Sequence, residues 1–420
     1  MTINTYKEYK NTGVEWLGKL PAHWDVFPLK AGFNLMKRPP PENCGVITAF
    51  RDGEVTLRSN RRMDGFTEAF QEIGYQGVEP NDLVIHAMDA FAGAIGVSDS
   101  KGKSTPVYSV CEPKRDYFSR YYGLVLRHIA LAGFIQSLAK GIRERSTDFR
   151  WSDAKNIPIP HPSIDEQKSI IKFLDNEIAK IDSLIAEQEK LIKLLKEKRQ
   201  AVISNAVTKG LDRQVKMKDS GVEWLGDIPE HWELKKIKWC AKLKNEKTSD
   251  RSNTIALENI EGWTGRFIDT ESKFEGDGVK FNEDDLLFGK LRPYLAKVFR
   301  ATMKGEAIGD FFVLEPKQNL LSQFAERLLI SSEFIDAINS STYGTKMPRV
   351  NWEYFSSMSI PLPPKHEQIQ ISNYLVTAIK EMDELIATSN NAVALLEERR
   401  TALISAAVTG QIDVRDSYGN

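Results

Sequence analysis

Apolar residues recur at alternating steps of three and four along two long stretches of the chain. The first stretch, from Ile164 to Val207, contains neither Gly nor Pro, and the second, from Ser372 to Ala407, repeats the same pattern. This spacing predicts two long helices, each with a coiled-coil seam. The predicted seam comprises Leu174, Ile178, Ile181, Ile185, Ile192 and Leu195 in the first helix and Leu375, Ile379, Met382, Ile386, Val393 and Leu396 in the second.

Polar residues interrupt both seams at matching places. Gln188 corresponds to Ser389, and Arg199 corresponds to Arg400. Polar seam residues commonly fix the register of a coiled coil at some cost in stability. Each helix could pair with another chain, but two matching seams in one chain favour an antiparallel intramolecular pair with a globular domain near each end.

The matching seams belong to a duplication of the whole chain. Residues 13–18 read GVEWLG, and the same six letters return at 221–226. The later parts of the two copies match in a second register, which ends with Ile157–Pro160 (IPIP) against Ile360–Pro363 (IPLP). Small changes of register are differences in loop length, which surface loops tolerate. We therefore interpret the chain as a tandem repeat.

Each copy begins with a globular part that mixes short β-rich runs with helical stretches. Runs such as 81–85, 107–110 and 311–314 predict strands, and the stretches 117–139 and 321–339 predict helices. The fold class we predict is α+β, with two pseudo-two-fold-related globular domains separated by two long antiparallel coiled-coil helices. The expected boundaries are 1–155 for the first globular domain, 156–212 for the central helix region, 213–358 for the second globular domain and 359–420 for the C-terminal helix region.

Composition narrows the class of protein without identifying a ligand. The 420 residues include 57 basic and 58 acidic side chains, so net charge gives no support for nucleic-acid binding. Three scattered cysteines, Cys44, Cys111 and Cys240, argue against a disulfide framework or a cysteine-based metal site. Without a long apolar run or an apolar signal core, we expect a cytoplasmic protein with no membrane contact.

Several short motifs together resemble the specificity subunit of type I restriction–modification enzymes. They are the duplicated opening GVEWLG…P-x-H-W, the IPIP and IPLP strands, the following Glu-Gln pairs, the long heptad helices and the terminal A-V-T-x-G. Glu166-Gln167 and Glu367-Gln368 are the two pairs, and 344–351 (GTKMPRVN) is typical of the segment before the helix. The first copy departs from the family there, because it reads GIRERSTD from Gly141.

The resemblance implies a division of labour between this chain and its partners. Each globular part would be a target recognition domain that reads one half of a bipartite, asymmetric double-stranded DNA sequence. The helices would set the spacing of the half-sites and dock two modification (methyltransferase) subunits. S-adenosylmethionine, Mg²⁺ and ATP would bind to partner subunits, which include motor–nuclease restriction subunits in the complete enzyme, and this chain would hold no cofactor.

Base reading requires Arg, Lys, Asn or Gln side chains on projecting segments. Basic clusters next to glycines supply such candidates in both copies, although solvated surface charge is the alternative for any single residue. The candidates are Arg58, Asn60, Arg61, Arg62, Lys101, Lys103, Arg143 and Arg145 in the first copy, and Lys247, Arg251, Lys290, Arg292, Lys346 and Arg349 in the second.

Two other classes of function remain as alternatives. One is an interaction scaffold whose globular ends bind protein, which salt-sensitive binding to duplex DNA would exclude. The other is a self-sufficient nuclease or methyltransferase, against which stands the lack of a complete catalytic motif. The six histidines show no zinc-ligand spacing, so we expect neither a catalytic residue nor a metal site in this chain.

Overall fold

The chain folds into two compact units that each combine a globular part with one half of each long helix. A computed structural model describes residues 4–61, 72–138, 148–248, 253–270, 277–342 and 347–415. Unit 1 comprises residues 1–187 and 392–420, and unit 2 comprises residues 188–391. The domain boundaries expected from the sequence, which separate the globular parts from the helices, remain a prediction.

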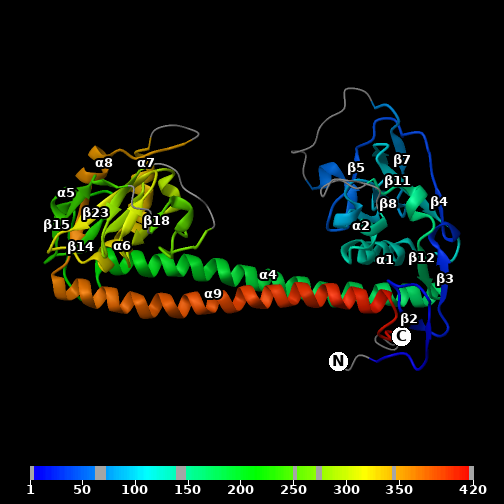
Figure 1. Cartoon of the computed structure of the whole chain (residues 1–420). Coiled ribbons are helices and arrows are strands. Elements are labelled where there is room, and N and C mark those ends of the chain that lie inside the picture. Colours follow the sequence, from blue (N-terminus) through cyan, green and yellow to red (C-terminus); the bar gives the residue numbers. More distant parts are fainter. Residues whose placement is uncertain are drawn as a thin grey trace. The chain divides into compact units, whose positions relative to one another are not determined.

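The two long helices form where the heptad pattern predicts them. Helix α4 spans Ile164–Lys209 and helix α9 spans Lys365–Val408 (Figure 1). Gly210 and Gly410 follow them with φ values of 76° and 70°, the left-handed conformation that commonly ends a helix at glycine. Every predicted seam residue is buried or half-buried.

Ion pairs give the direction of the helix pairing inside each unit. In unit 1, Asp182 of α4 lies 3.4 Å from Nε of Arg400 of α9, while Leu174 and Ala407 share one core. In unit 2, Nε of Arg199 lies 3.1 Å from Oδ1 of Asp383, while Ile203 and Ile379 share one core. As the residue numbers increase along α4, the numbers of the contacting residues on α9 decrease. The helix halves are therefore antiparallel in each unit.

The globular part of unit 1 is built on a four-stranded antiparallel sheet in the order β4-β11-β8-β9. Strand β11 is the longest, and its residues Tyr108 to Cys111 are buried because both neighbouring strands cover it. The strands of unit 1 are β1 Tyr9–Asn11, β2 Lys19–Pro21, β3 Asp25–Pro28, β4 Phe33–Leu35, β5 Ile47–Ala49, β6 Val55–Leu57, β7 Gln76–Val78, β8 Leu83–His86, β9 Ile95–Val97, β10 Gly102–Ser104, β11 Tyr108–Pro113 and β12 Pro158–His161.

Unit 2 repeats this sheet in the order β16-β23-β20-β21, beside a second sheet β17-β19-β22-β18. The shared strand order confirms that the duplication seen in the sequence is a duplication of fold. The strands of unit 2 are β13 Met217–Asp219, β14 Asp227–Pro229, β15 Glu233–Lys236, β16 Ala241–Lys244, β17 Lys247–Thr248, β18 Thr254–Ile255, β19 Gly278–Phe281, β20 Leu286–Gly289, β21 Val298–Arg300, β22 Gly305–Ala307, β23 Phe311–Pro316 and β24 Ser359–Leu362.

Short helices cover the sheets and connect them to the long helices. The predicted helix over 117–139 is interrupted, because Gly133 takes a φ of 81° between α1 and α2. The short helices are α1 Ser119–Leu131, α2 Phe134–Leu138 and α3 Trp151–Ala154 in unit 1, and α5 Ile237–Cys240, α6 Ser322–Ile330, α7 Ser332–Ser340 and α8 Trp352–Ser357 in unit 2. This arrangement confirms the α+β class with two long helices.

The glutamine of each Glu-Gln pair fastens a long helix to its globular part. Gln167 is fully buried, its Oε1 accepts from the backbone N of Phe118 at 2.9 Å, and its Nε2 donates to the Pro162 carbonyl at 2.8 Å. Gln368 makes the same two contacts in unit 2, with Leu321 N at 2.8 Å and Pro363 O at 2.9 Å. One side chain thus joins the helix start, the preceding proline strand and the first turn of α1 or α6.

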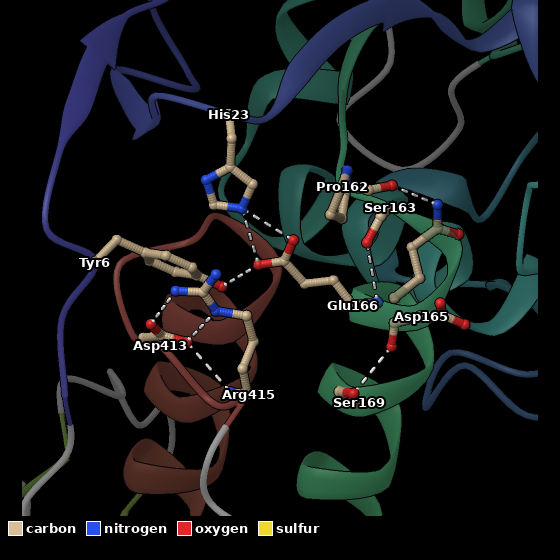
Figure 2. A network of polar contacts seen from close by, with 10 residues as sticks. Tyr6, His23, Pro162, Ser163, Asp165, Glu166, Ser169, Asp413 and Arg415 are labelled. Atoms are coloured by element: carbon tan, nitrogen blue, oxygen red, sulfur yellow. Dashed lines mark hydrogen bonds and ion pairs between the residues drawn. The ribbon is translucent and has the colours of Figure 1, made fainter.

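The glutamate of each pair binds the histidine of the repeated P-x-H-W motif. Figure 2 shows Glu166 accepting from Tyr6 Oη at 2.7 Å and lying 3.1 Å from Nε2 of His23. In unit 2, Glu367 lies 2.7 Å from His231 Nε2 and accepts from Trp232 Nε1 at 2.9 Å. The motif therefore anchors the start of each globular part to the start of a long helix.

Candidate DNA interface

The best-defined cationic surface lies in unit 2, where two sequence clusters meet. Lys290 and Arg292 follow strand β20, and Arg349 precedes α8. Leu291 forms an antiparallel bridge with Arg349, and the backbone N of Arg292 donates to the Pro348 carbonyl at 2.7 Å. The two segments are thereby joined by backbone hydrogen bonds, so three predicted DNA-binding residues share one surface.

Charge on this surface is only partly neutralised. Asp310 lies 2.8 Å from Arg349 and 3.9 Å from Lys290, and it therefore serves both cations. Arg292 takes a φ of 51°, which is uncommon for a residue with a Cβ, and its Nε is buried without a hydrogen-bond partner among the described residues. Strained, under-bonded arginines of this kind occur preferentially at functional sites.

A broad groove occupies the corresponding place in unit 1. Ala87 matches Lys290 in the repeat. The Ala87 carbonyl accepts from the backbone N of Phe149, and the Lys290 carbonyl accepts from the backbone N of Val350, both at 3.1 Å. The groove beside Ala87 has a volume of about 1910 Å³, and its lining includes Lys37, Tyr75, Gln76, Met88, Arg150 and Lys155. Its rim thus offers three cations, an amide and an aromatic ring, which are the groups that contact phosphates and bases.

The side chains in this groove differ in how firmly they are held. Gln76 Nε2 donates to the Tyr108 carbonyl at 2.7 Å, so its amide has one fixed direction. The Arg150 side chain is 71% exposed and pairs with Asp148 at 2.7 Å. A DNA phosphate could replace Asp148 as the partner of this guanidinium group. These residues stand alone in the sequence, without a cluster or motif, and our sequence analysis therefore missed them.

The other predicted residues of unit 1 gather near strands β5, β6 and β10. Arg58 and Asn60 lie on a short 3-10 turn after β6, where Arg58 Nε donates to Thr48 Oγ1 at 3.3 Å and Asn60 donates to Thr56 at 2.8 Å. Arg61 pairs with Asp52 at 2.6 Å and lies over the ring of Phe50. These contacts hold the three side chains against their own turn.

The two predicted lysines of unit 1 have acidic partners. Lys101 is exposed and pairs with Glu79 at 2.8 Å, and Lys103 pairs with Glu72. Lys247 is exposed on β17 in unit 2. Five further candidates, Arg62, Arg143, Arg145, Arg251 and Lys346, lie outside the described residues.

The long helices carry exposed leucines at matching repeat positions. Leu184 and Leu385 are 46% and 54% exposed, and Leu194 and Leu395 are 51% and 57% exposed. Leu184 and Leu395 belong to unit 1, whereas Leu194 and Leu385 belong to unit 2. Each unit therefore presents one of these matched leucines from α4 and one from α9 to solvent.

No metal-binding group of three His, Cys, Asp or Glu side chains is found among the described residues. Within the same part of the chain, no helix has both the length and the apolar character required to cross a bilayer.

Known proteins with similar sequences are named specificity subunits. Residues 229–395 match the family described as Type I restriction modification DNA specificity domain. The chain is 26% identical to the Type I restriction enzyme EcoDI specificity subunit of Escherichia coli, over 67% of this chain and 68% of that protein. It is 25% identical to the MjaVIII specificity subunit of Methanocaldococcus jannaschii, over 95% of each chain.

Solved structures share the fold at low sequence identity. A chain from a study of complex assembly and conformational transition in the type I R-M system aligns with a TM-score of 0.68 and 13% identity, over 93% of this chain and 98% of that chain. The HsdS subunit from Thermoanaerobacter tengcongensis aligns with a TM-score of 0.52 and 13% identity, over 94% and 98%. The family match over residues 229–395 and these relatives show that the chain is similar in sequence to type I restriction–modification specificity subunits, and the solved structures show that it shares their fold.

Proposed function

We propose that each globular part reads one half of a bipartite, asymmetric DNA target, while the long helices set the spacing of the half-sites and dock two modification subunits. In this proposal the chain contributes recognition and geometry, and the chemistry belongs to its partners.

The observation that carries the proposal is the contrast between two corresponding surfaces on one repeated fold. In unit 2 the surface presents Lys290, Arg292 and Arg349, whereas in unit 1 it presents Ala87, Met88 and Arg150 beside the groove. A surface conserved in position but altered in side chains suits two readers of different sequences. Phosphate contacts would position each reader, and contacts to base edges would specify its half-site.

The helices have features suited to a rigid spacer. The buried glutamines Gln167 and Gln368 fix each helix start to a globular part, and each unit contains an ion pair between α4 and α9. Half-sites read from one face of DNA must lie about one helical turn, ~34–36 Å, or a multiple of it apart. A helix pair keeps such a distance better than a flexible loop.

The repeated leucines support the docking of two copies of one partner. Unit 1 exposes Leu184 and Leu395, and unit 2 exposes Leu385 and Leu194. These are the same two positions of the repeat in each unit. Exposed apolar side chains on a soluble helix mark surfaces that another protein covers. Two equivalent surfaces therefore suit two identical subunits.

Methylation mapping after co-expression with the cognate modification subunit tests the proposal. We expect a bipartite adenine motif, and exchange of residues 1–155 for the corresponding domain of another family member should change one half and leave the other unaltered. Arg349→Ala should relax the half-site read by unit 2, and Arg150→Ala, in the groove of unit 1, should affect the other half. A scaffold that does not read DNA would show neither motif nor salt-dependent duplex binding.

A further inference from the structure

Unit 1 contains a pocket between α1 and α9 that the functions above do not use. Its volume is about 400 Å³, within the range typical of ligand sites. Leu124, Leu131 and Ile404 contribute apolar walls, and Arg127 and Arg400 contribute guanidinium groups. The pocket is therefore apolar with a cationic side.

Both guanidinium groups have a donor left over. The Nε atoms of Arg127 and Arg400 are buried, and neither forms a hydrogen bond within the described part of the chain. The Nε of Arg400, whose side chain is 42% exposed, lies 3.4 Å from Oδ1 of Asp182, and Arg127 donates from Nη2 to the Arg51 carbonyl at 3.4 Å. Burial, and next the charge of Arg400, lower the pKa of Arg127. Arg127 is thus a largely buried cation with an unpaired Nε, and an anion bound beside it would offset both its burial and the repulsion from Arg400.

The second copy shows how the corresponding place is filled. Arg199, the repeat counterpart of Arg400, donates from Nη1 to the Trp263 carbonyl at 2.9 Å and lies 3.1 Å from Asp383. Trp263 itself packs against the core of unit 2. A backbone carbonyl and a carboxylate of the same chain thus satisfy the arginine in unit 2.

The matching turn of unit 1 lacks the aromatic residue. Gly53 in unit 1 and Gly265 in unit 2 each lie in a turn and take a positive φ. The turn of Gly53 lies beside Gly93, and the turn of Gly265 lies beside Ala296, the repeat counterpart of Gly93. This match aligns Arg51 with Trp263, but the Arg51 side chain is 68% exposed and does not fill the space. Among the described residues, no indole lines the pocket beside Arg127 and Arg400.

We propose that this pocket binds an acidic peptide segment of a protein partner, with an apolar side chain between Leu124 and Ile404 and a carboxylate between Arg127 and Arg400. The inference rests on the proposed docking of modification subunits on the helices. Leu395 lies one turn of α9 before Glu398 at the pocket rim, so the pocket extends the docking surface of unit 1. In unit 2 the place that corresponds to this pocket is already filled. Only the modification subunit bound at unit 1 would therefore gain the contact with the pocket.

The test measures binding of the purified modification subunit to the full-length chain by calorimetry at two salt concentrations. The wild type should show two unequal binding events. Arg127→Gln and Arg400→Gln should each weaken the tighter event by about tenfold and reduce its salt dependence, because a buried charge pair is lost. Arg120→Gln, on the same helix but outside the pocket, is the matched control and should bind like the wild type.

Two outcomes separate this inference from the proposed function. If the wild type does not bind the modification subunit, the docking proposal itself fails. If it binds, and both pocket variants retain wild-type affinity and salt dependence, the pocket assignment is overturned. A photocrosslinker at Leu131, 51% exposed at the pocket, should capture an acidic peptide of the partner, and a crosslink confined to this chain would refute the partner assignment.

Discussion

Arg199 of α4 and Asp383 of α9 form an ion pair in unit 2, and their repeat counterparts, Arg400 and Asp182, form the corresponding pair in unit 1 with the helices exchanged. The two pairs differ in surroundings. The Arg199 side chain is 5% exposed and also binds the Trp263 carbonyl, whereas the Arg400 side chain is 42% exposed. One seam position of the repeat thus serves as a buried anchor in one unit and a half-exposed contact in the other.

This difference predicts unequal costs for the same substitution. Arg199→Met should destabilise the helix pair of unit 2 by about 2 kcal/mol or more, because it leaves a partly buried carboxylate with fewer partners. Arg400→Met should cost less than about 1 kcal/mol, since its pair is half-exposed. Hydrogen exchange of α4 amides near each site measures the two effects, and equal protection losses would contradict the assignment.

The buried glutamines should be among the least tolerant positions of the helices. Gln167→Ala or Gln368→Ala removes three hydrogen bonds, two to carbonyls and one from a backbone N, at a fully buried position. We expect a loss of about 2–3 kcal/mol, because buried backbone groups lose their partners. Denaturant unfolding measures this loss, with exposed Gln370→Ala as the control; similar midpoints for both variants would disprove the role.

Lengthening both helices together should lengthen the gap in the DNA target. Three heptads inserted after Glu187 and three after Asn391 keep the seam in register and add ~32 Å, close to one turn of DNA, so that both readers stay on one face. Methylation mapping should then find both half-sites unchanged and the gap longer. Insertion into one helix alone shifts the seam and should impair assembly. An unaltered gap in the double insertion would count against the spacer proposal.

The exposed leucines should matter for assembly and not for folding. Leu184→Ser with Leu395→Ser should leave thermal unfolding unchanged, because both side chains already contact solvent. The same variant should lose one of two bound modification subunits, measured by the mass of the complex in solution. Leu174→Ser, at a buried seam position, is the contrasting variant and should lower the unfolding temperature.

Much of the architecture could be predicted because it rests on local periodicity. The steps of three and four predicted both long helices and their buried face. The repeated GVEWLG and proline motifs predicted a duplicated fold. The interruption at Gly133 was missed, since one glycine within a helical pattern does not by itself require a break.

The candidate interface was only partly predictable, because it depends on contacts between distant segments. Arg292 and Arg349 were both in basic clusters, but only the β20 and α8 segments, joined through Leu291 and Pro348, bring them together. Tyr75, Gln76 and Lys155 carry no sequence signal at all. Their role as groove residues follows from the sheet and α3 that place them around one space.

The helices, the duplication and the family resemblance follow from the amino-acid order, because heptad spacing and repeated motifs are properties of neighbouring residues along the chain. Which polar side chains are satisfied depends on contacts between residues far apart in the chain. Arg199 and Arg400 occupy one position of the repeat, yet the fold supplies a carbonyl from a distant turn to the first and an open pocket to the second. The reason is that hydrogen-bond partners depend on which distant turns reach a helix: the Trp263 carbonyl accepts from Arg199, whereas the Arg51 carbonyl accepts from Arg127.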